Sequence, residues 1–302
     1  MNDMSTSADP SVTEPAPPPT VDRPGILTRI LHWMIDDPIA AVALLVLLII
    51  FTCALFADQI APYDPTLQDY ASMLDPPSSI HLLGTDDLGR DVFSRLIHGA
   101  SASVYAAVLA VSVATVLGVP VGLIAGYAGG WIDQIISRIL DTFLSFPAIV
   151  LAIAVTGVLG IGLTNAMLSV GIVFAPQLAR LVRARALVLK QELYVEASQC
   201  FGASSGWILM RHILPNAIQP VLVQITLLMA VGLLAEASLS FLGLGMQPPD
   251  PSWGSMIARA YVYAQIAPAQ MYAPGIAILI TALAFNTVGE SLREALDPTS
   301  RN

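Results

Sequence analysis

The sequence predicts an all-α membrane protein with six transmembrane helices and both termini in the cytoplasm. Of its 302 residues, 55% are hydrophobic and only 12% are charged, whereas soluble domains carry roughly 25% charged residues. A span needs about 20 apolar residues, and helices buried in a soluble protein would also need charged outer faces. Five runs contain no Asp, Glu, Lys or Arg, and each is long enough to cross a bilayer: 38–57, 96–132, 142–179, 212–235 and 260–289.

The third uncharged run predicts two helices. A single helix over 142–179 would be about 57 Å long at 1.5 Å per residue, and the bilayer core is only about 30 Å thick. Gly157, Gly160, Gly162 and Asn165 interrupt the middle of this run, as turn residues do between helices. We therefore expect six spans, near residues 39–57, 103–126, 139–159, 165–183, 217–242 and 272–292.

The basic residues set the expected orientation. With a cytoplasmic amino terminus, ten of the thirteen Lys and Arg residues fall in inner segments, and only Arg90, Arg95 and Arg259 fall outside. Such an excess of positive charge marks the cytoplasmic side. The first 37 residues hold six prolines and no apolar block, which indicates a disordered tail and no cleavable signal peptide. The expected organisation is a cytoplasmic tail 1–37, a first span 38–57, an extracytoplasmic segment 58–100, a core 101–293 with an inner loop 190–216, and a cytoplasmic tail 294–302.

The second half of the extracytoplasmic segment predicts an amphipathic helix that Thr85 or Asp86 caps. Asp86 and Arg90, like Asp91 and Arg95, form acid-before-base pairs four residues apart, a spacing that stabilises helices. The helix is either a cover for the bundle or an element for gating or docking. Its apolar stripe would consist of Leu88, Val92, Leu96 and Ile97.

The second span carries a row of small residues at every fourth position. Such a row allows two transmembrane helices to approach closely. Because a period of four drifts against the 3.6 residues of a turn, only three or four successive positions can face one neighbour. Packing within the chain is the preferred interpretation, with a dimer contact second, and Pro120 is expected to bend the helix. The row is Ala102, Ala106, Ala110, Ala114, Gly118, Gly122, Gly126 and Gly130.

Two carboxylates fall in or near spans, where a charged group is costly and often functional. Asp141 lies three residues after Arg138, which predicts an ion pair at the membrane interface. Glu236 lies toward the outer part of the fifth span, close to Ser238 and Ser240. It either faces a translocation pathway together with these serines or forms structural hydrogen bonds with them.

The inner loop 190–216 predicts a helix, a break and a second helix. Gly202 permits the turn, Ser204 or Ser205 can cap the second helix, and Pro215 is expected to end it. A short amphipathic helix at the end of a membrane bundle can insert into a groove of a partner or rest on the lipid surface. The physical properties of this loop leave both possibilities open.

The composition excludes several classes of function. Lys190 is the only lysine and follows no glycine-rich loop, so the chain has no recognisable nucleotide site. The formal charge of -9 argues against nucleic-acid binding. Cys53 and Cys200 lie in separate segments and the four histidines are dispersed, so no metal site, disulfide framework or hydrolase nucleophile with a nearby base is predicted.

The inner loop resembles the EAA signature of membrane subunits of bacterial ATP-binding-cassette (ABC) importers. Ser198 stands where this signature has its second alanine, and His212 stands at a position usually held by isoleucine. Further segments are similar to the dipeptide, oligopeptide and nickel branch of these permeases: 83–91, 144–147, 179–183, 236–245, 251–254 and 296–298. The matching residues of the signature are Glu196, Ala197, Ser198, Gly202, Leu214 and Pro215.

The resemblance implies the second, C-type permease subunit, in which one N-terminal helix precedes a five-helix type I importer core. The implied partners are a homologous permease in a heterodimer, two ATPase subunits or one fused ATPase, an extracytoplasmic substrate-binding protein, and membrane lipid. ATP and Mg would bind to the ATPases, and this chain would hold no cofactor. In this interpretation Glu196 fixes the short helix by polar contacts, and Gly202 sets its angle.

The resemblance also implies a place in the bacterial inner membrane and a role in coupling ATP hydrolysis to alternating access for di- and oligopeptides. Asp86, Arg90, Asp91 and Trp253 are the candidates for binding-protein docking or for a gate. Nickel, glutathione or another small solute is the alternative cargo. A different class, an ion-coupled secondary transporter using Asp141 and Glu236, would leave the EAA loop unexplained.

Overall fold

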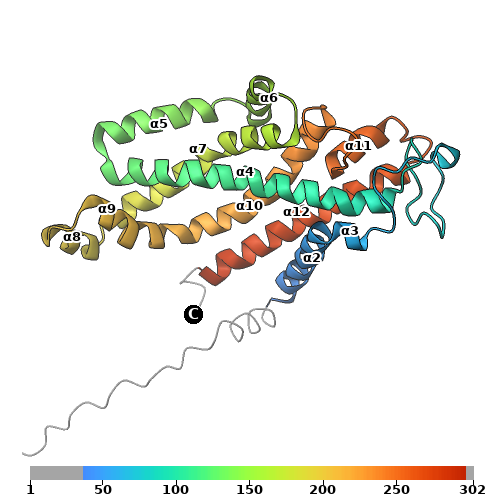
Figure 1. Ribbon diagram of the computed structural model, residues 1–302. Helices are drawn as coiled ribbons and strands as arrows, with labels where there is room; N and C mark the ends of the chain where they lie inside the picture. Colours follow the sequence, from blue (N-terminus) through green and yellow to red (C-terminus); the bar gives the residue numbers. More distant parts are fainter. Residues whose placement is uncertain (1–36, 297–302) are drawn as a thin grey trace, which may run out of the picture. The chain divides into compact units, whose positions relative to one another are not determined.

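Five long helices run lengthwise through the molecule (Figure 1). The computed structural model describes residues 37–296. Residues 1–36, which make up the expected N-terminal tail except for its last residue, and residues 297–302 lie outside the described part. Within that part, each of the five is long and apolar enough to span a membrane. They are α2 (Pro38–Leu55), α4 (Val92–Ala128), α7 (Leu163–Leu189), α10 (Leu214–Phe241) and α12 (Ala269–Leu296).

The third predicted span, 139–159, falls in a bent pair of helices. α5 (Gly130–Leu144) and α6 (Ala148–Leu159) meet at an angle of 94°. A single helix at 139–159 is therefore not formed, because Pro147 lacks the N–H that would continue α5 and disfavours helical geometry in the residue before it. The described residues contain six spans when this pair is counted as one.

The division between α6 and α7 is confirmed. Gly160 and Gly162 adopt φ angles of 99° and 144°, which only glycine adopts readily. The Asn165 side chain donates to the Leu159 carbonyl at 3.0 Å and so satisfies a group at the end of α6. The glycines at this point turn the chain back into the bundle.

Three glycines of the small-residue row pack α4 against α7, which confirms packing within the chain. A Cβ atom built on Gly122 would lie 2.4 Å from the Ala179 carbonyl oxygen, and one on Gly118 would lie 2.6 Å from that of Ala175. Gly126 makes an equally close approach to α7. The helix continues through Pro120, and van der Waals contact between the two backbones holds this seam together.

The helix predicted in the outer segment begins later than expected and is the start of α4. α4 begins at Val92, where the Asp91 side chain accepts from the Ser94 N–H at 2.7 Å. The preceding residues form turns because Gly89 has a φ angle of 72° and its backbone lies against Asp69. Before α4, the segment contains only α3 (Ala57–Ile60) and the short 3₁₀ helix η1 (Tyr70–Ser72).

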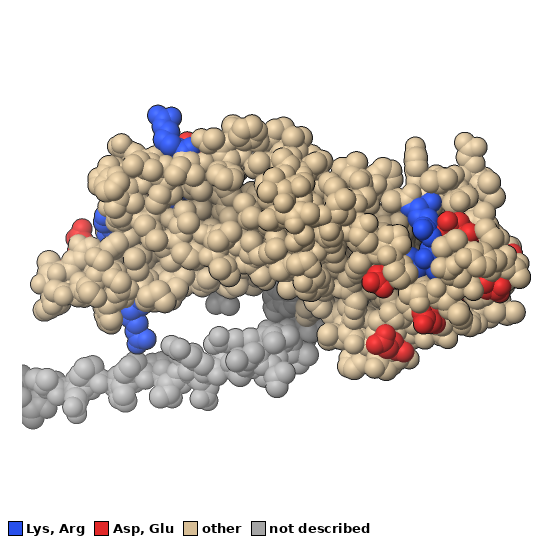
Figure 2. Space-filling model, turned by 45° about the horizontal axis from the view of Figure 1, so that its top comes forward, with Lys and Arg blue, Asp and Glu red and all other residues tan. Residues whose placement is uncertain are grey.

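The core lies between α4, α7, α10 and α12, with α2 packed against α4 and α12. Four short helices complete the described part: α8 (Leu193–Cys200), α9 (Ser205–Ile208), the π-helical turn η2 (Leu209–Ile213) and α11 (Trp253–Tyr261). On the face shown in Figure 2, charged side chains gather toward the two ends and leave a broad uncharged band between them. Such a band suits the hydrocarbon region of a bilayer.

Candidate functional site

The EAA-like loop forms a helical hairpin at one end of the bundle (Figure 1). Gly202 ends α8 with a φ angle of 78°, as the sequence predicts. Its N–H donates to Gln199 O at 2.9 Å, and the Ala203 N–H donates to Ser198 O at 3.0 Å, the two bonds of a Schellman cap. Ser204 then caps α9 through a bond from the Trp207 N–H at 3.4 Å. Backbone geometry thus defines the turn.

The second helix of the loop continues into α10. The π-helical turn η2 joins α9 to α10, whose first two residues are Leu214 and Pro215. The prediction that Pro215 ends this helix is wrong, because proline fits the first turn of a helix, where its missing N–H costs nothing. The helical path therefore runs from Ser205 to Phe241, and a displacement of the loop reaches the membrane span directly.

α8 leaves an apolar face open. Val195 is fully buried, whereas Leu193 is 80% and Phe201 91% exposed. Ala197 is exposed on the same side. Large apolar side chains left in solvent at the end of a bundle are typical of a protein contact surface.

Glu196 forms none of the expected polar side-chain contacts with the described residues. The Glu196 side chain is exposed, and no hydrogen bond or ion pair links it to another of the described residues. Instead, Ser198 Oγ lies 3.2 Å from His212 Nε2. The two positions at which the loop departs from the EAA signature are therefore in contact with each other.

The outer docking candidates are brought together, but they are buried. Arg90 Nη2 lies 2.6 Å from Asp86 Oδ2, and Asp91 accepts from Ser94 and lies 2.9 Å from His81 Nδ1. All three candidates are almost inaccessible to solvent, and Asp91 is engaged as the cap of α4. They stabilise the outer segment and present no surface on which a binding protein could dock in this conformation.

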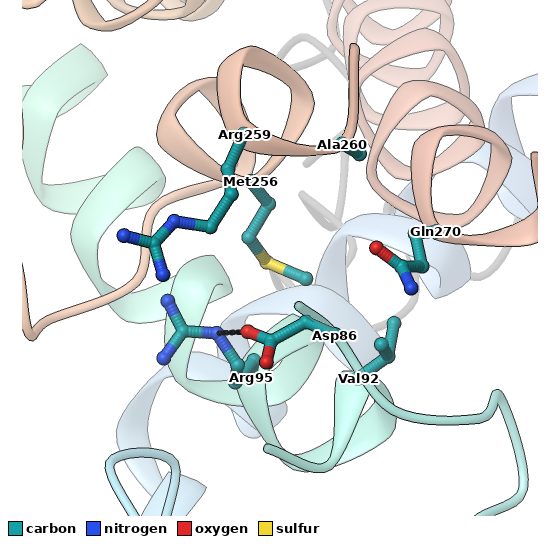
Figure 3. Close-up of a pocket in the computed structure, with 7 residues that line it drawn as sticks. All are labelled: Asp86, Val92, Arg95, Met256, Arg259, Ala260 and Gln270. Atoms are coloured by element: carbon teal, nitrogen blue, oxygen red, sulfur yellow. Dashed lines mark ion pairs between the residues drawn. The ribbon is translucent and has the colours of Figure 1, made fainter. Parts of the chain in front are cut away.

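Trp253 is equally buried, and its indole N–H donates to Leu96 O at 2.9 Å. Nearby, Asp86, Arg95 and Gln270 surround a cavity of about 20 Å³ (Figure 3), which has room for about one water molecule. The Gln270 amide donates to Thr85 O at 2.6 Å. Trp253 therefore fixes α11 to α4 and is not available as a docking residue.

Glu236 forms structural hydrogen bonds. Its side chain is fully buried, and it accepts from Ser240 Oγ at 2.7 Å and from Ser103 Oγ at 3.2 Å. Ser103 also accepts from the Trp253 N–H at 3.2 Å, so the network joins α4, α10 and α11. Of the three pathway candidates only Ser238 is exposed. Glu236 and Ser240 face no open space here, and the structural interpretation is the one that the geometry supports.

Asp141 pairs with α7. Its Oδ1 lies 2.5 Å from Arg180 Nη2, so the ion pair predicted with Arg138 is replaced by one between two helices. Asp133 on α5 likewise binds Arg183, with 2.6 Å between Oδ2 and Nη2. These pairs hold α5 along α7.

Sequence reasoning missed a polar groove at the end of the bundle near the loop. It has a volume of about 650 Å³ and lies between α7, α10 and α12. The amide side chains Asn216, Gln219 and Gln224 recur at helical spacing on one side of α10, a signal that the sequence contains within a mostly apolar span. Arg185 and Arg293 complete the polar lining, and none of the lining residues within 37–296 is a carboxylate.

No group of three or more His, Cys, Asp or Glu side chains in residues 37–296 is arranged to hold a metal ion. Cys53 and Cys200 are both free cysteines. The candidate site consists of the helical hairpin, the span that continues from it, and the groove that this span helps to line.

The fold and the loop define a class of membrane transport subunits. The family model of the binding-protein-dependent transport system inner membrane component matches residues 118–302. The model of the N-terminal TM domain of oligopeptide transport permease C matches residues 31–77. The chain belongs to this family of ABC importer permease subunits and is a multi-pass protein of the bacterial inner membrane.

Among its relatives is the glutathione transport system permease protein GsiD of Pectobacterium atrosepticum, 44% identical over 86% of this chain and 87% of that protein. The dipeptide transport system permease protein DppC of Alkalihalophilus pseudofirmus is 39% identical over 96% of both chains. A solved structure of the MetNI methionine ABC transporter in an inward-facing conformation superposes with a TM-score of 0.56 at 21% identity, covering 68% of this chain and 97% of that one. This last likeness shows the shared fold.

Proposed function

We propose that the chain forms half of the translocation pathway of an ATP-driven importer and transmits ATP hydrolysis on partner ATPases to that pathway. The observation that carries the proposal is the exposed apolar face of α8, with Leu193 and Phe201 in solvent. The backbone turn at Gly202 presents this face, and the hairpin is continuous with the span α10. A partner that grips α8 can therefore move α10 directly.

The proposed orientation places α8 in the cytoplasm, with both termini on the same side. Basic residues of the described part gather around the hairpin end, on α5, α7, the loop and the last turn of α12. The excess of positive charge supports a cytoplasmic location for this end. ATP and Mg would then bind to the partner ATPases, either two subunits or one fused protein, and the chain would pair with a homologous permease and receive cargo from an extracytoplasmic binding protein.

For the cargo we propose small peptides. The two relatives carry the names of dipeptide and glutathione transport systems, and glutathione is itself a tripeptide. Among the described residues, the groove at the hairpin end offers two arginines and three side-chain amides and no carboxylate, a lining that suits an amide-rich solute with free carboxylates. The cargo would instead be nickel or another small solute if the isolated binding protein retained such a ligand and no peptide.

The coupling proposal is tested by co-purification of the ATPase subunits with the permease. Burial of a Phe side chain contributes about 1.5–3 kcal/mol, so Phe201→Ser should weaken ATPase attachment at least tenfold and abolish ATP-driven uptake. Leu67→Ser is the control, because Leu67 is also an exposed apolar residue but belongs to the outer segment. Undiminished ATPase attachment in Phe201→Ser would refute the docking role of α8.

A further inference from the structure

His212 and Ser198 connect the two arms of the hairpin. Ser198 lies on α8 and His212 in the π-helical turn η2, and Ser198 Oγ is 3.2 Å from His212 Nε2. Ser198 Oγ also donates its single hydrogen to Tyr194 O, 2.8 Å away. A hydroxyl has only one hydrogen, so it accepts from His212, which carries its hydrogen on Nε2.

The His212 ring also packs between two aromatic rings. Its centroid is 5.5 Å from that of Tyr194 on α8 and 4.9 Å from that of Trp207 on α9, with interplanar angles of 51° and 75°. Edge-to-face and tilted contacts at these distances are favourable for aromatic side chains. One side chain therefore contacts both helices of the hairpin, by packing and by a hydrogen bond.

The remaining attachment of α8 is modest. Val195 is its one buried residue, and Glu196, the anchor that the sequence favours, is exposed. A Cβ atom on Gly202 would meet nothing within 4 Å, so side-chain packing does not brace the turn. Beyond the backbone cap at Gly202 and the buried Val195, the contacts of His212 are therefore the side-chain link that fixes α8 relative to α9.

The backbone around His212 is unusual as well. Leu209–Ile213 forms a π-helical turn, a rare element that is frequent at functional sites. The Asn216 side chain on α10 donates to the His212 carbonyl at 2.6 Å. His212 is thus joined to α8 and α9 by its side chain and to the first turn of α10 by its backbone.

We propose that His212 is a positioning residue for energy coupling: it clamps α8 to the start of α10 so that a force applied to α8 moves the span as one rigid body. The proposal rests on the proposed function, because it assumes that ATPase subunits apply this force. Without the clamp, α8 would still present Leu193 and Phe201 and still bind the ATPase, but part of its movement would be lost in bending at Gly202.

The test uses the complete transporter in proteoliposomes and measures a radiolabelled dipeptide imported per ATP hydrolysed, together with ATPase co-purification. His212→Ala should lower this ratio about tenfold. Ser198→Ala should lower it roughly fivefold, the change in equilibrium that loss of one hydrogen bond produces. Both variants should retain the ATPase subunits. Ser205→Ala, an exposed serine on α9, is the control and should leave the ratio unchanged.

A rescue variant separates positioning from loss of folding. Ser198→Ala combined with His212→Phe keeps an aromatic ring between Tyr194 and Trp207 and removes both partners of the hydrogen bond, so no donor is left unpaired as it is in Ser198→Ala. The double variant should therefore recover at least half of the wild-type ratio. A wild-type ratio in His212→Ala, or a double variant as poor as His212→Ala, would overturn the clamp. Failure of the proposed function has a different signature, since the wild-type complex would then show no ATP-dependent uptake.

Discussion

Substitution of Gly122 by alanine tests the seam between α4 and α7. The added Cβ atom would lie 2.4 Å from the Ala179 carbonyl oxygen and 2.8 Å from the Val182 Cβ atom, whereas ordinary contact begins at 3.4 Å. The obstacle includes backbone, so rotation of a side chain cannot relieve the clash. The two helices must therefore separate by about 1 Å at this point, the difference between the two distances.

The cost follows from dispersion. A carbon pair at optimal distance contributes about 0.1–0.2 kcal/mol, and a gap of about 1 Å forfeits up to half of it, so a seam of about 30 pairs loses roughly 2 kcal/mol. Alanine returns about 0.5–1 kcal/mol through its better helix propensity. Gly122→Ala should therefore destabilise the protein by about 1–1.5 kcal/mol.

Gly157→Ala is the matched control. Gly157 is also helical, on α6, and its Cβ atom would meet nothing within 4 Å. Only the propensity gain remains there, so this variant should be slightly more stable than wild type. Thermal unfolding of the purified protein in one detergent, followed by tryptophan fluorescence, should give Tm changes of opposite sign for the two variants. A Tm of Gly122→Ala equal to or above the wild-type value would refute the close-packed seam.

Three further outcomes are expected. Gly202→Val should impair transport, because a β-branched residue at a φ angle of 78° costs about 1–2 kcal/mol. Gly206→Ala in α9 is the control and should leave transport intact, and equal transport by both variants would show that the turn has no role in coupling. Glu236→Leu should lower the Tm by leaving two buried hydroxyls without their acceptor, a cost of about 1–3 kcal/mol, and an unchanged Tm would contradict the network. Asp133→Asn should lower the Tm more than Asp141→Asn, because their side chains are 15% and 56% exposed, and the reverse order would show that burial does not decide the strength of these pairs.

The sequence predicted most of the helices because their signals are local. Absence of charge over about 20 residues, glycines between α6 and α7, and a small-residue row on α4 each act through nearby backbone or through a helix face. The turn at Gly202 is of the same kind, since it depends on the φ angle of one residue. By contrast, the sequence interpretation extended one span across Pro147 and began the outer helix at Thr85 or Asp86, whereas turns delay its start to Val92.

The side-chain partners were harder to predict because they lie far apart in the chain. Asp141 binds Arg180 on α7 instead of the nearby Arg138, and the docking candidates Asp86 and Arg90 are buried against each other. Helical spacing gives the neighbours on one helix but does not say which helix packs beside it. The amide stripe of the groove was present in α10, but its exposure depended on the positions of α7 and α12.

The sequence by itself determined that this chain is a multi-span membrane protein with an EAA-like loop. Composition shows which segments suit a lipid environment, and short motifs specify local backbone geometry. Only the tertiary structure decided what each polar residue does. Glu236 became a buried acceptor because α4 brings Ser103 beside it, and His212 became the link of the hairpin because Gly202 folds Tyr194 and Ser198 back onto it. A hydrogen bond requires its two atoms within about 3 Å, and in a bundle of helices the packing of distant segments sets that distance.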